Sequence, residues 1–258
     1  MKRLKYTKSA ASENIENIFM CARTFYNFSN YFCGGSLVMV ENSLYVSRIP
    51  GVNQNTPVGN IIPLLEKERS HKINIQPWPK YPEYYDLPKV SFKIAHSNDC
   101  ILIKYDVEEH EVLARYRNTN DPVYKDSCVE FFIAFGNDRA YYNLEFNRLG
   151  TCLGGFGVPG ETRASLPAEL LETIKYERSI LQKKGDPDPT INWTLMLVIP
   201  VQVLCFHQLN TLKRKECRVN FYKCGDDLTQ PHFLAWKNIL TPKPDFHQPD
   251  FFGNAEFA

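Results

Sequence analysis

The stretch 127–147 reads SCVEFFIAF, GND and RAYYNLEFN, and apolar residues recur at every second position of its first and last parts. Because successive side chains point to opposite faces of a strand, this period of two predicts two β-strands. The triplet Gly136-Asn137-Asp138 between them consists of residue types that favour tight turns. The stretch is therefore expected to form an antiparallel hairpin.

Short alternating segments of the same kind lie on both sides of this hairpin. They are KVSFKIAH (89–96), CILIKYDV (100–107), EVLARYR (111–117), INWTLMLVIP (191–200), CRVNFYKC (217–224) and NAEFA (254–258). Only two segments, 61–70 and 166–178, are typical of helices, and no strand–helix–strand alternation is present. The pattern predicts an all-β fold, a jelly-roll-like antiparallel β-sandwich with one or two short helices.

The domain organisation follows from where these signals begin. We expect residues 77–258 to form the sandwich and residues 1–76, which are polar and loop-like, to form a partly disordered N-terminal extension. Met39 offers a second plausible start, so residues 1–38 could be a start-site artefact; a small genuine subdomain is the alternative.

Composition excludes several classes of function. The 30 basic and 29 acidic residues are spread along the chain and leave a net charge of +1, so no nucleic-acid partner is expected. The eight cysteines form no C-x-x-C pair, and we interpret them as reduced thiols of the core. No signal peptide or membrane span is visible, which favours a cytoplasmic location.

The predicted strands separate polar from apolar faces. In 141–147, Tyr141, Asn143 and Glu145 share one face. Glu130 lies on the less apolar face of its strand, and Asn220 and Tyr222 share a face of 217–224. Amides and carboxylates hydrogen-bond sugar hydroxyls, and aromatic rings stack on the C–H faces of sugars. These faces indicate a carbohydrate site, although a solvated outer face is the simpler alternative.

Five segments carry a resemblance to a known family: DPVYKDSCVEFFIAF (121–135), YYNLEFNRLG (141–150), RVNFYKCGD (218–226), FLAW (233–236) and PDFHQPDFFGNAEF (244–257). In this order they resemble the family 9 carbohydrate-binding modules, and more closely the family-9-like domains of glycan-degrading gut bacteria. The resemblance runs from about residue 90 to the C-terminus. It implies a β-sandwich that binds the end of a glycan chain without catalysis and is supported by structural calcium.

The resemblance also implies ligand-binding positions. Glu130 matches the sugar-binding carboxylate of the family, while Tyr124 and Phe246 take the places of its two clamp tryptophans. Asn143 and Tyr222 fall near a family arginine and glutamine that bind the ligand. The expected ligand-binding set, completed by neighbouring polar residues, is Tyr124, Glu130, Asn143, Glu145, Asn220, Tyr222, Phe246 and His247. Both tryptophans are replaced by smaller aromatics, so weaker binding, another sugar or loss of binding is expected.

We expect no organic cofactor. The oxygen donors considered for calcium are Asp106, Asp121, Asp126, Asp226 and Asp227, although no calcium-loop motif connects them. The predicted function is non-catalytic binding of a mono- or oligosaccharide in support of glycan breakdown, with a separate glycoside hydrolase as a candidate partner. One alternative is a glycoside hydrolase that uses Glu130 and Glu145. Others are a scaffold that has lost its sugar site and, least favoured because axial ligands are scarce, a haem-binding sandwich.

Overall fold

The structure, a computed structural model, describes residues 32–33, 36–37, 43–80, 87–182 and 190–258. The expected extension over residues 1–38 lies almost entirely outside the described residues. Within it, β1 (Phe32–Cys33) and β2 (Ser36–Leu37) form a short antiparallel pair. Residues 43–258 form a separate compact unit.

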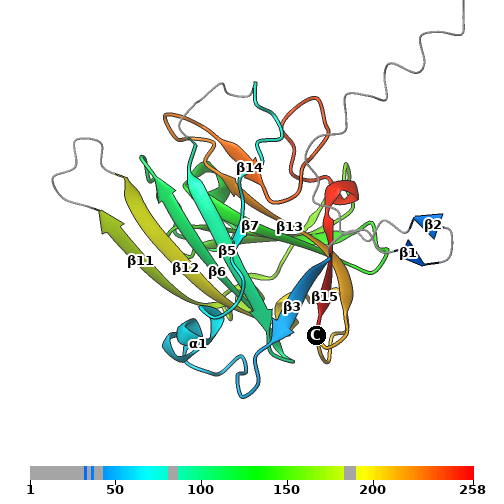
Figure 1. The fold of residues 1–258 in the computed structure, drawn as a ribbon. Coiled ribbons are helices and arrows are strands. Elements are labelled where there is room, and N and C mark those ends of the chain that lie inside the picture. The colour runs from blue at the N-terminus through cyan, green and yellow to red at the C-terminus, as the bar shows by residue number, and fades with distance from the viewer. Residues whose placement is uncertain (1–31, 34–35, 38–42, 81–86, 183–189) are drawn as a thin grey trace, which may run out of the picture. The chain divides into compact units, whose positions relative to one another are not determined.

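The compact unit is a β-sandwich of two layers (Figure 1), which confirms the predicted fold class. The first layer runs β10 (Ala164–Ser165), β9 (Cys152–Gly157), β8 (Tyr141–Asn147), β7 (Cys128–Phe135), β13 (Glu216–Cys224) and β15 (Gly253–Phe257), with β14 (Phe233–Ala235) also paired to β13. The second runs β3 (Leu44–Arg48), β5 (Lys89–His96), β6 (Cys100–Glu109), β12 (Ile191–Pro200) and β11 (Lys175–Gln182), with β4 (His71–Lys72) paired to β5.

The core lies between the layers and is built from the alternation visible in the sequence. Val129, Phe131 and Ile133 of β7 point inward and are buried. Phe221 of β13 stacks on Phe92 of the opposite layer, with 3.7 Å between the ring centroids. The predicted inward faces of β7, β8 and β13 are therefore confirmed. Since this face is apolar, their opposite face is left to form the site.

Strand β3 joins the two layers and modifies the predicted architecture. It pairs in parallel with β15 of the first layer and with β5 of the second, so the otherwise antiparallel sheet is mixed. Ser43–Ala258 is one compact unit. Residues 43–76 therefore contribute to the sandwich, and its boundary lies near residue 42 and not near residue 76. The stretch MVENSLYVSRIP (39–50) is strand-like in the sequence, but the pairing of β3 with β15 and β5 is long-range and leaves no local signal.

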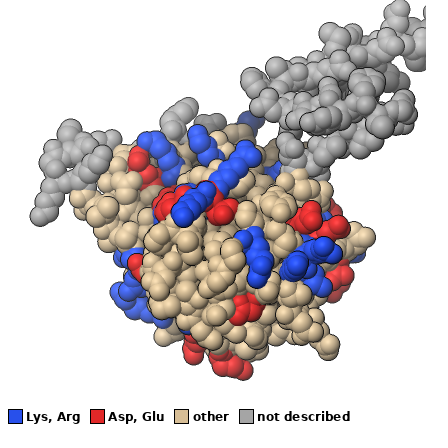
Figure 2. Space-filling model, turned by 60° about the horizontal axis from the view of Figure 1, so that its bottom comes forward, with Lys and Arg blue, Asp and Glu red and all other residues tan. Residues whose placement is uncertain are grey.

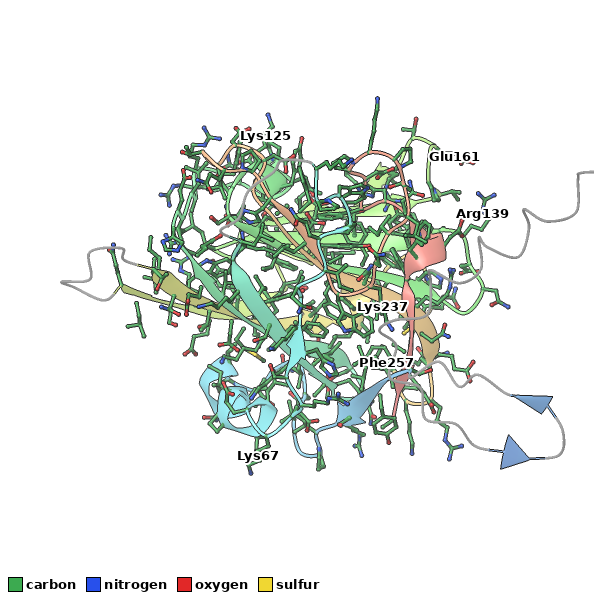
Figure 3. The ribbon with its side chains drawn as sticks, turned by 45° about the horizontal axis from the view of Figure 1, so that its top comes forward. Lys67, Lys125, Arg139, Glu161, Lys237 and Phe257 are labelled. Carbon is green, nitrogen blue, oxygen red and sulfur yellow. The ribbon has the colours of Figure 1, made fainter. Side chains whose placement is uncertain are left out.

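Short helical elements cover opposite sides of the sandwich. Helix α1 (Val58–Leu65) packs Ile61 and Leu65 on the outer face of the second layer. The 3₁₀ turns η1 (Val123–Lys125) and η3 (Pro249–Phe251) lie with their loops over the outer face of the first layer. Figure 3 shows Lys125, the last residue of η1, and Lys67, two residues after α1, on opposite sides of the molecule. A further helix, α2 (Ala168–Leu171), and the 3₁₀ turn η2 (Val201–Val203) complete the fold.

Two predicted elements differ from the structure. Residues 111–117 are not a strand, because the backbone N–H groups of Arg115 and Tyr116 donate to the Asp126 carboxylate at 2.9 and 3.0 Å. The helix expected over 166–178 ends at Leu171, and β11 begins at Lys175 because the whole of β11 pairs with residues Ile191 to Val198 of β12.

Charge is evenly mixed on the face drawn in Figure 2. Lysine and arginine side chains lie beside aspartates and glutamates, and the described residues form no large patch of one sign on that face. No helix in the described part of the chain is long and apolar enough to cross a membrane.

Candidate functional site

A cavity of about 460 Å³ opens on the outer face of the first layer. Strands β7, β8, β9 and β13 supply its floor, and the segments around residues 120–124, 163–165, 226, 233 and 244–247 form its walls. This volume lies in the range of small-molecule sites in proteins. The cavity thus opens on the strand face that the sequence analysis interpreted as a carbohydrate site because of its polar residues.

The floor is centred on two neighbouring glutamates. Glu130 of β7 and Glu145 of β8 are directly opposite each other in the antiparallel register, and both are buried. The Asn143 amide donates a 2.9 Å hydrogen bond to Glu145 Oε1. Glu145 Oε2 has no hydrogen-bond partner within the described residues. A buried carboxylate oxygen without a donor is costly, so this atom is a ready acceptor for a ligand hydroxyl.

Arg163 fixes the orientation of Asn143. Its Nη2 donates to Asn143 Oδ1 at 2.6 Å and to the Tyr141 carbonyl at 3.0 Å, and Nη1 donates to the Gly157 carbonyl at 2.8 Å. The guanidinium also lies 4.0 Å from the centroid of the Tyr141 ring. With its oxygen held by arginine, the Asn143 amide must present its N–H₂ group toward Glu145.

Burial changes the protonation of the floor. Removal from water raises the pKa of Glu145 from 4.5 to about 7, against the opposing effect of the Asn143 hydrogen bond. Burial also raises the pKa of Glu130 well above its usual range, and the nearby Cys224 and Glu145 add to this rise. The floor is therefore largely protonated in weak acid and gains negative charge near neutral pH.

Aromatic rings line the walls. Tyr124 on η1 and Phe233 on β14 are half-buried, and Phe246 is 9 % exposed. Phe246 stacks on Tyr222 with 4.1 Å between centroids, and the Tyr222 hydroxyl donates to the Phe246 carbonyl at 3.2 Å. Tyr222 therefore supports the wall from behind.

His247 lies at the edge of the cavity in neutral form. Its Nδ1 shares a 2.7 Å hydrogen bond with the Tyr141 hydroxyl. Burial, together with the charge of Arg163, lowers the pKa of His247 to about 4. A neutral imidazole can either donate to or accept from a ligand.

Glycines keep the floor open. Gly154 and Gly155 of β9 line the cavity, and a Cβ atom at Gly155 would lie 2.7 Å from Asn143 Oδ1. The interruption in the sequence TCLGGFG thus has a structural cause: a side chain at this position would displace Asn143.

Six of the eight residues expected to bind ligand line this one cavity: Tyr124, Glu130, Asn143, Glu145, Phe246 and His247. The other two, Asn220 and Tyr222, do not. Both are 0 % exposed, because the segment after β14 covers their strand face. The Asn220 amide instead holds this segment, donating to the Lys237 carbonyl at 3.1 Å and accepting from the Lys237 N–H at 2.9 Å.

Sequence reasoning missed several lining residues, among them Arg163, Cys224 and Asp226. Arg163 lies in a loop without the alternation of a strand. Its position beside Asn143 could therefore not be predicted from which residues share a strand face. Cys224 could have been found, since it shares the face of Tyr222 on the same strand.

The five aspartates considered for calcium do not form an oxygen cage. Asp106 pairs with Lys104 at 2.7 Å, and Asp227 pairs with Arg115. Asp126 Oδ2 accepts from backbone N–H groups and from Asn147 Nδ2 at 2.9 Å. Backbone N–H groups, an amide and cations thus already engage three of the five aspartates. Structural calcium stays a prediction.

Comparison with known proteins agrees with this architecture. The family described as carbohydrate-binding family 9 matches residues 60–257. The chain belongs to this family. It is similar to a putative carbohydrate-binding protein from Bacteroides uniformis, at 36 % identity and a TM-score of 0.75, over 84 % of this chain and 100 % of that one.

Two more distant structures share the fold of this family 9 chain. A family 9 module from Caldicellulosiruptor kristjanssonii in complex with glucose has 13 % identity and a TM-score of 0.51, covering 84 % of this chain and 95 % of that one. The same organism's module in complex with cellotriose has 13 % identity and a TM-score of 0.50, covering 83 % and 93 %. No curated protein matches the chain.

Proposed function

We propose that this protein binds a mono- or oligosaccharide in the cavity over β7 and β8 and does not cleave it. The observation that carries the proposal is the unpartnered Oε2 atom of Glu145, buried beneath a cavity with aromatic walls. A sugar offers the complementary groups, because its hydroxyls donate to carboxylates and its C–H faces pack on aromatic rings. Family membership and the 36 % identical relative support the same ligand class.

The proposed occupant is a free sugar or the end of a glycan chain. Polar groups gather on the floor, with Asn143 and Glu145 at its centre, while the aromatic residues stand in the walls. A terminal sugar unit can enter such a cavity and present several hydroxyls to the floor at once. In support of glycan breakdown, the protein would hold this end while a separate glycoside hydrolase acts on the chain.

The arrangement of the glutamates argues against hydrolysis. A glycosidase acts with two carboxyl groups that flank the scissile bond. Glu130 and Glu145 instead extend side by side from neighbouring strands of one sheet face. Both would approach a bound sugar from the same side. Glu130 also makes no ion pair in the described part of the chain that would keep it charged as a nucleophile.

Isothermal titration tests the proposal. Glucose, cellobiose, cellotriose, xylobiose and mannobiose are titrated into the whole chain and into Tyr124→Ala and Asn143→Ala. The matched control is Tyr45→Ala, which removes a 63 % exposed tyrosine that does not line the cavity. We expect saturable binding that both cavity variants weaken at least about tenfold and the control leaves unchanged.

Two results would contradict the proposal. Absence of heat with every sugar, in a protein with a cooperative unfolding transition, would favour the scaffold hypothesis. Release of new reducing ends from cellotriose would favour the hydrolase hypothesis, and loss of that release in Glu145→Gln would assign the activity to the cavity.

A further inference from the structure

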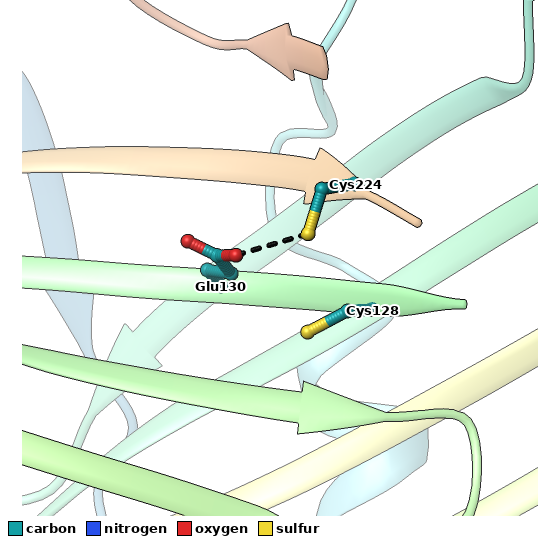
Figure 4. A group of neighbouring side chains, drawn as sticks. All are labelled: Cys128, Glu130 and Cys224. Carbon is teal, nitrogen blue, oxygen red and sulfur yellow. Dashed lines mark hydrogen bonds between the residues drawn. The ribbon is translucent and has the colours of Figure 1, made fainter. Parts of the chain in front are cut away.

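Two cysteines face each other beside the cavity. Cys128 of β7 and Cys224 of β13 are directly opposite in the antiparallel register. Glu130 lies two residues along β7 and so shares their face. The Sγ atoms and a Glu130 carboxylate oxygen all lie within 4.8 Å of one another, and the Cys224 thiol donates to Glu130 Oε1 at 3.1 Å (Figure 4).

The three groups are withdrawn from water, and the buried Lys223 whose charge acts on Cys128 is already paired with Glu109 at 2.8 Å. Cys128, Glu130 and Cys224 are 0 %, 3 % and 2 % exposed. No lysine, arginine or histidine of the described residues forms an ion pair with Glu130. Two thiols and a carboxyl can all release protons, so a cation at their centre would compensate the charges that burial otherwise disfavours.

We propose that Cys128, Cys224 and Glu130 bind a thiophilic divalent metal ion, with Zn²⁺ as the best fit. Zinc takes thiolate ligands at about 2.3 Å and carboxylate ligands at about 2.0–2.2 Å, usually in tetrahedral geometry. Two such ligands of one ion lie about 3.5–4 Å apart. The observed limit of 4.8 Å therefore requires only small side-chain rotations, with no movement of the strands.

The fourth coordination position would face the cavity. Cys224 and Glu130 both line it, whereas Cys128 does not. An ion bound by all three residues thus has protein on the Cys128 side and open volume on the other. Water from the cavity would complete the coordination, as in zinc sites that keep one open position.

Metal binding must release protons. Burial raises the pKa of Cys128 to about 12 and that of Glu130 well above its usual range, while the hydrogen bond with Cys128, together with burial, raises the pKa of Cys224. Thiols bind a metal ion as thiolates, so coordination of one Zn²⁺ releases the protons of both cysteines into solvent. The affinity for the ion is expected to rise with pH.

Metal titration of the whole chain under reducing conditions tests the site. Co²⁺ serves as the probe, since thiolate coordination gives a charge-transfer absorption band, and Zn²⁺ is then added in competition. We expect one equivalent of metal and a band that Cys128→Ser and Cys224→Ser remove. The loss in affinity should be at least about 100-fold, because removing even an outer partner of a ligand costs 10–100-fold.

Matched controls come from the other described cysteines. Cys205 is exposed and Cys217 is buried on β13, and neither belongs to the cluster. Cys205→Ser and Cys217→Ala should therefore retain the band and the affinity. Glu130→Gln should keep both thiolates, so the band persists with weaker affinity.

A spectroscopic measurement on the unmodified chain tests the site even if the cysteine variants fail to fold. X-ray absorption at the zinc edge should show two sulfur and two oxygen neighbours. The proposal is overturned by no sulfur neighbours, by binding that survives both cysteine substitutions, or by a reduced chain that binds no metal. None of these readouts needs a sugar, so their failure is separate from failure of the sugar site.

Discussion

Replacing Glu145 by glutamine should weaken sugar binding and reduce its dependence on pH. The carboxylate accepts one hydrogen bond from Asn143 at 2.9 Å and leaves Oε2 without a donor among the described residues. A sugar hydroxyl that donates to Oε2 adds a hydrogen bond to a charged group, which contributes about 1.5–3 kcal/mol. At neutral to alkaline pH, the variant should therefore bind about 10- to 150-fold more weakly than the wild type.

The pH dependence follows from the raised pKa of Glu145. Because burial moves this pKa to about 7, about nine-tenths of the accepting carboxylate is ionised at pH 8 and only about one part in a hundred at pH 5. Sugar affinity of the wild type should fall as pH decreases across this range, by up to the full contribution of the carboxylate. The variant has no proton to gain at this position and should show a shallower profile, with the remaining slope from Glu130 and from Asp226, whose pKa burial raises to about 6.

Stability should change in the opposite direction. The folded pKa of about 7 exceeds the unfolded value of 4.5, so between these values the folded protein binds more protons than the unfolded chain. The free energy of unfolding therefore falls as pH rises from 4.5 to 7, by about 3 kcal/mol from this one group. Glu145→Gln should remove that part of the decline.

Isothermal titration and urea unfolding at pH 5 and pH 8 measure both effects. The control is Glu161→Gln, which neutralises an exposed carboxylate outside the cavity and should behave as the wild type (Figure 3). Equal affinities of wild type and Glu145→Gln at pH 8 would refute the reasoning. So would tighter wild-type binding at pH 5, which would mean that a protonated Glu145 donates to the ligand.

The remaining predictions concern the walls and the floor. Phe246→Ala should lower the free energy of unfolding by about 3–5 kcal/mol in urea titrations, since the ring is buried against Tyr222; an unchanged midpoint would contradict this. Tyr222→Phe removes a 3.2 Å hydrogen bond and should cost about 1 kcal/mol in the same assay, with sugar affinity unchanged, whereas direct ligand contact would weaken binding. Gly155→Ala should displace Asn143 and weaken sugar binding about tenfold in calorimetry, and wild-type affinity would show that Asn143 is dispensable.

The sequence predicts the two-layer core well because strand alternation is a local property. The inward face of β7, with Phe131 and Ile133, follows directly from the period of two. The parallel pairing of β3 with β15 and β5 is not predictable in this way. This pairing depends on which sheet edges remain open after the other strands have paired. No local sequence pattern carries that information.

The candidate site shows the same division between local and long-range information. Parity places Asn143 and Glu145 on one face, and the structure brings Glu130 beside them through register. Parity also places Tyr222 on the site face, but it cannot reveal that the segment carrying Phe246 covers this ring. Loop residues that line the cavity, such as Arg163, are brought to it by tertiary contacts alone.

The energetics of the floor distinguish a binding protein from an inert scaffold. Glu130 and Glu145 are both buried, and among the described residues neither is paired with a cation within salt-bridge distance. Such groups destabilise a fold, and apolar residues of similar volume at the same positions would avoid this cost. The neighbouring Phe132 and Tyr141 already form an apolar surface that could accommodate them. The sandwich therefore does not need these carboxyl groups for its stability, which supports the two roles proposed for them: acceptors for sugar hydroxyls at Glu145 and, with the two thiols, a cation site at Glu130.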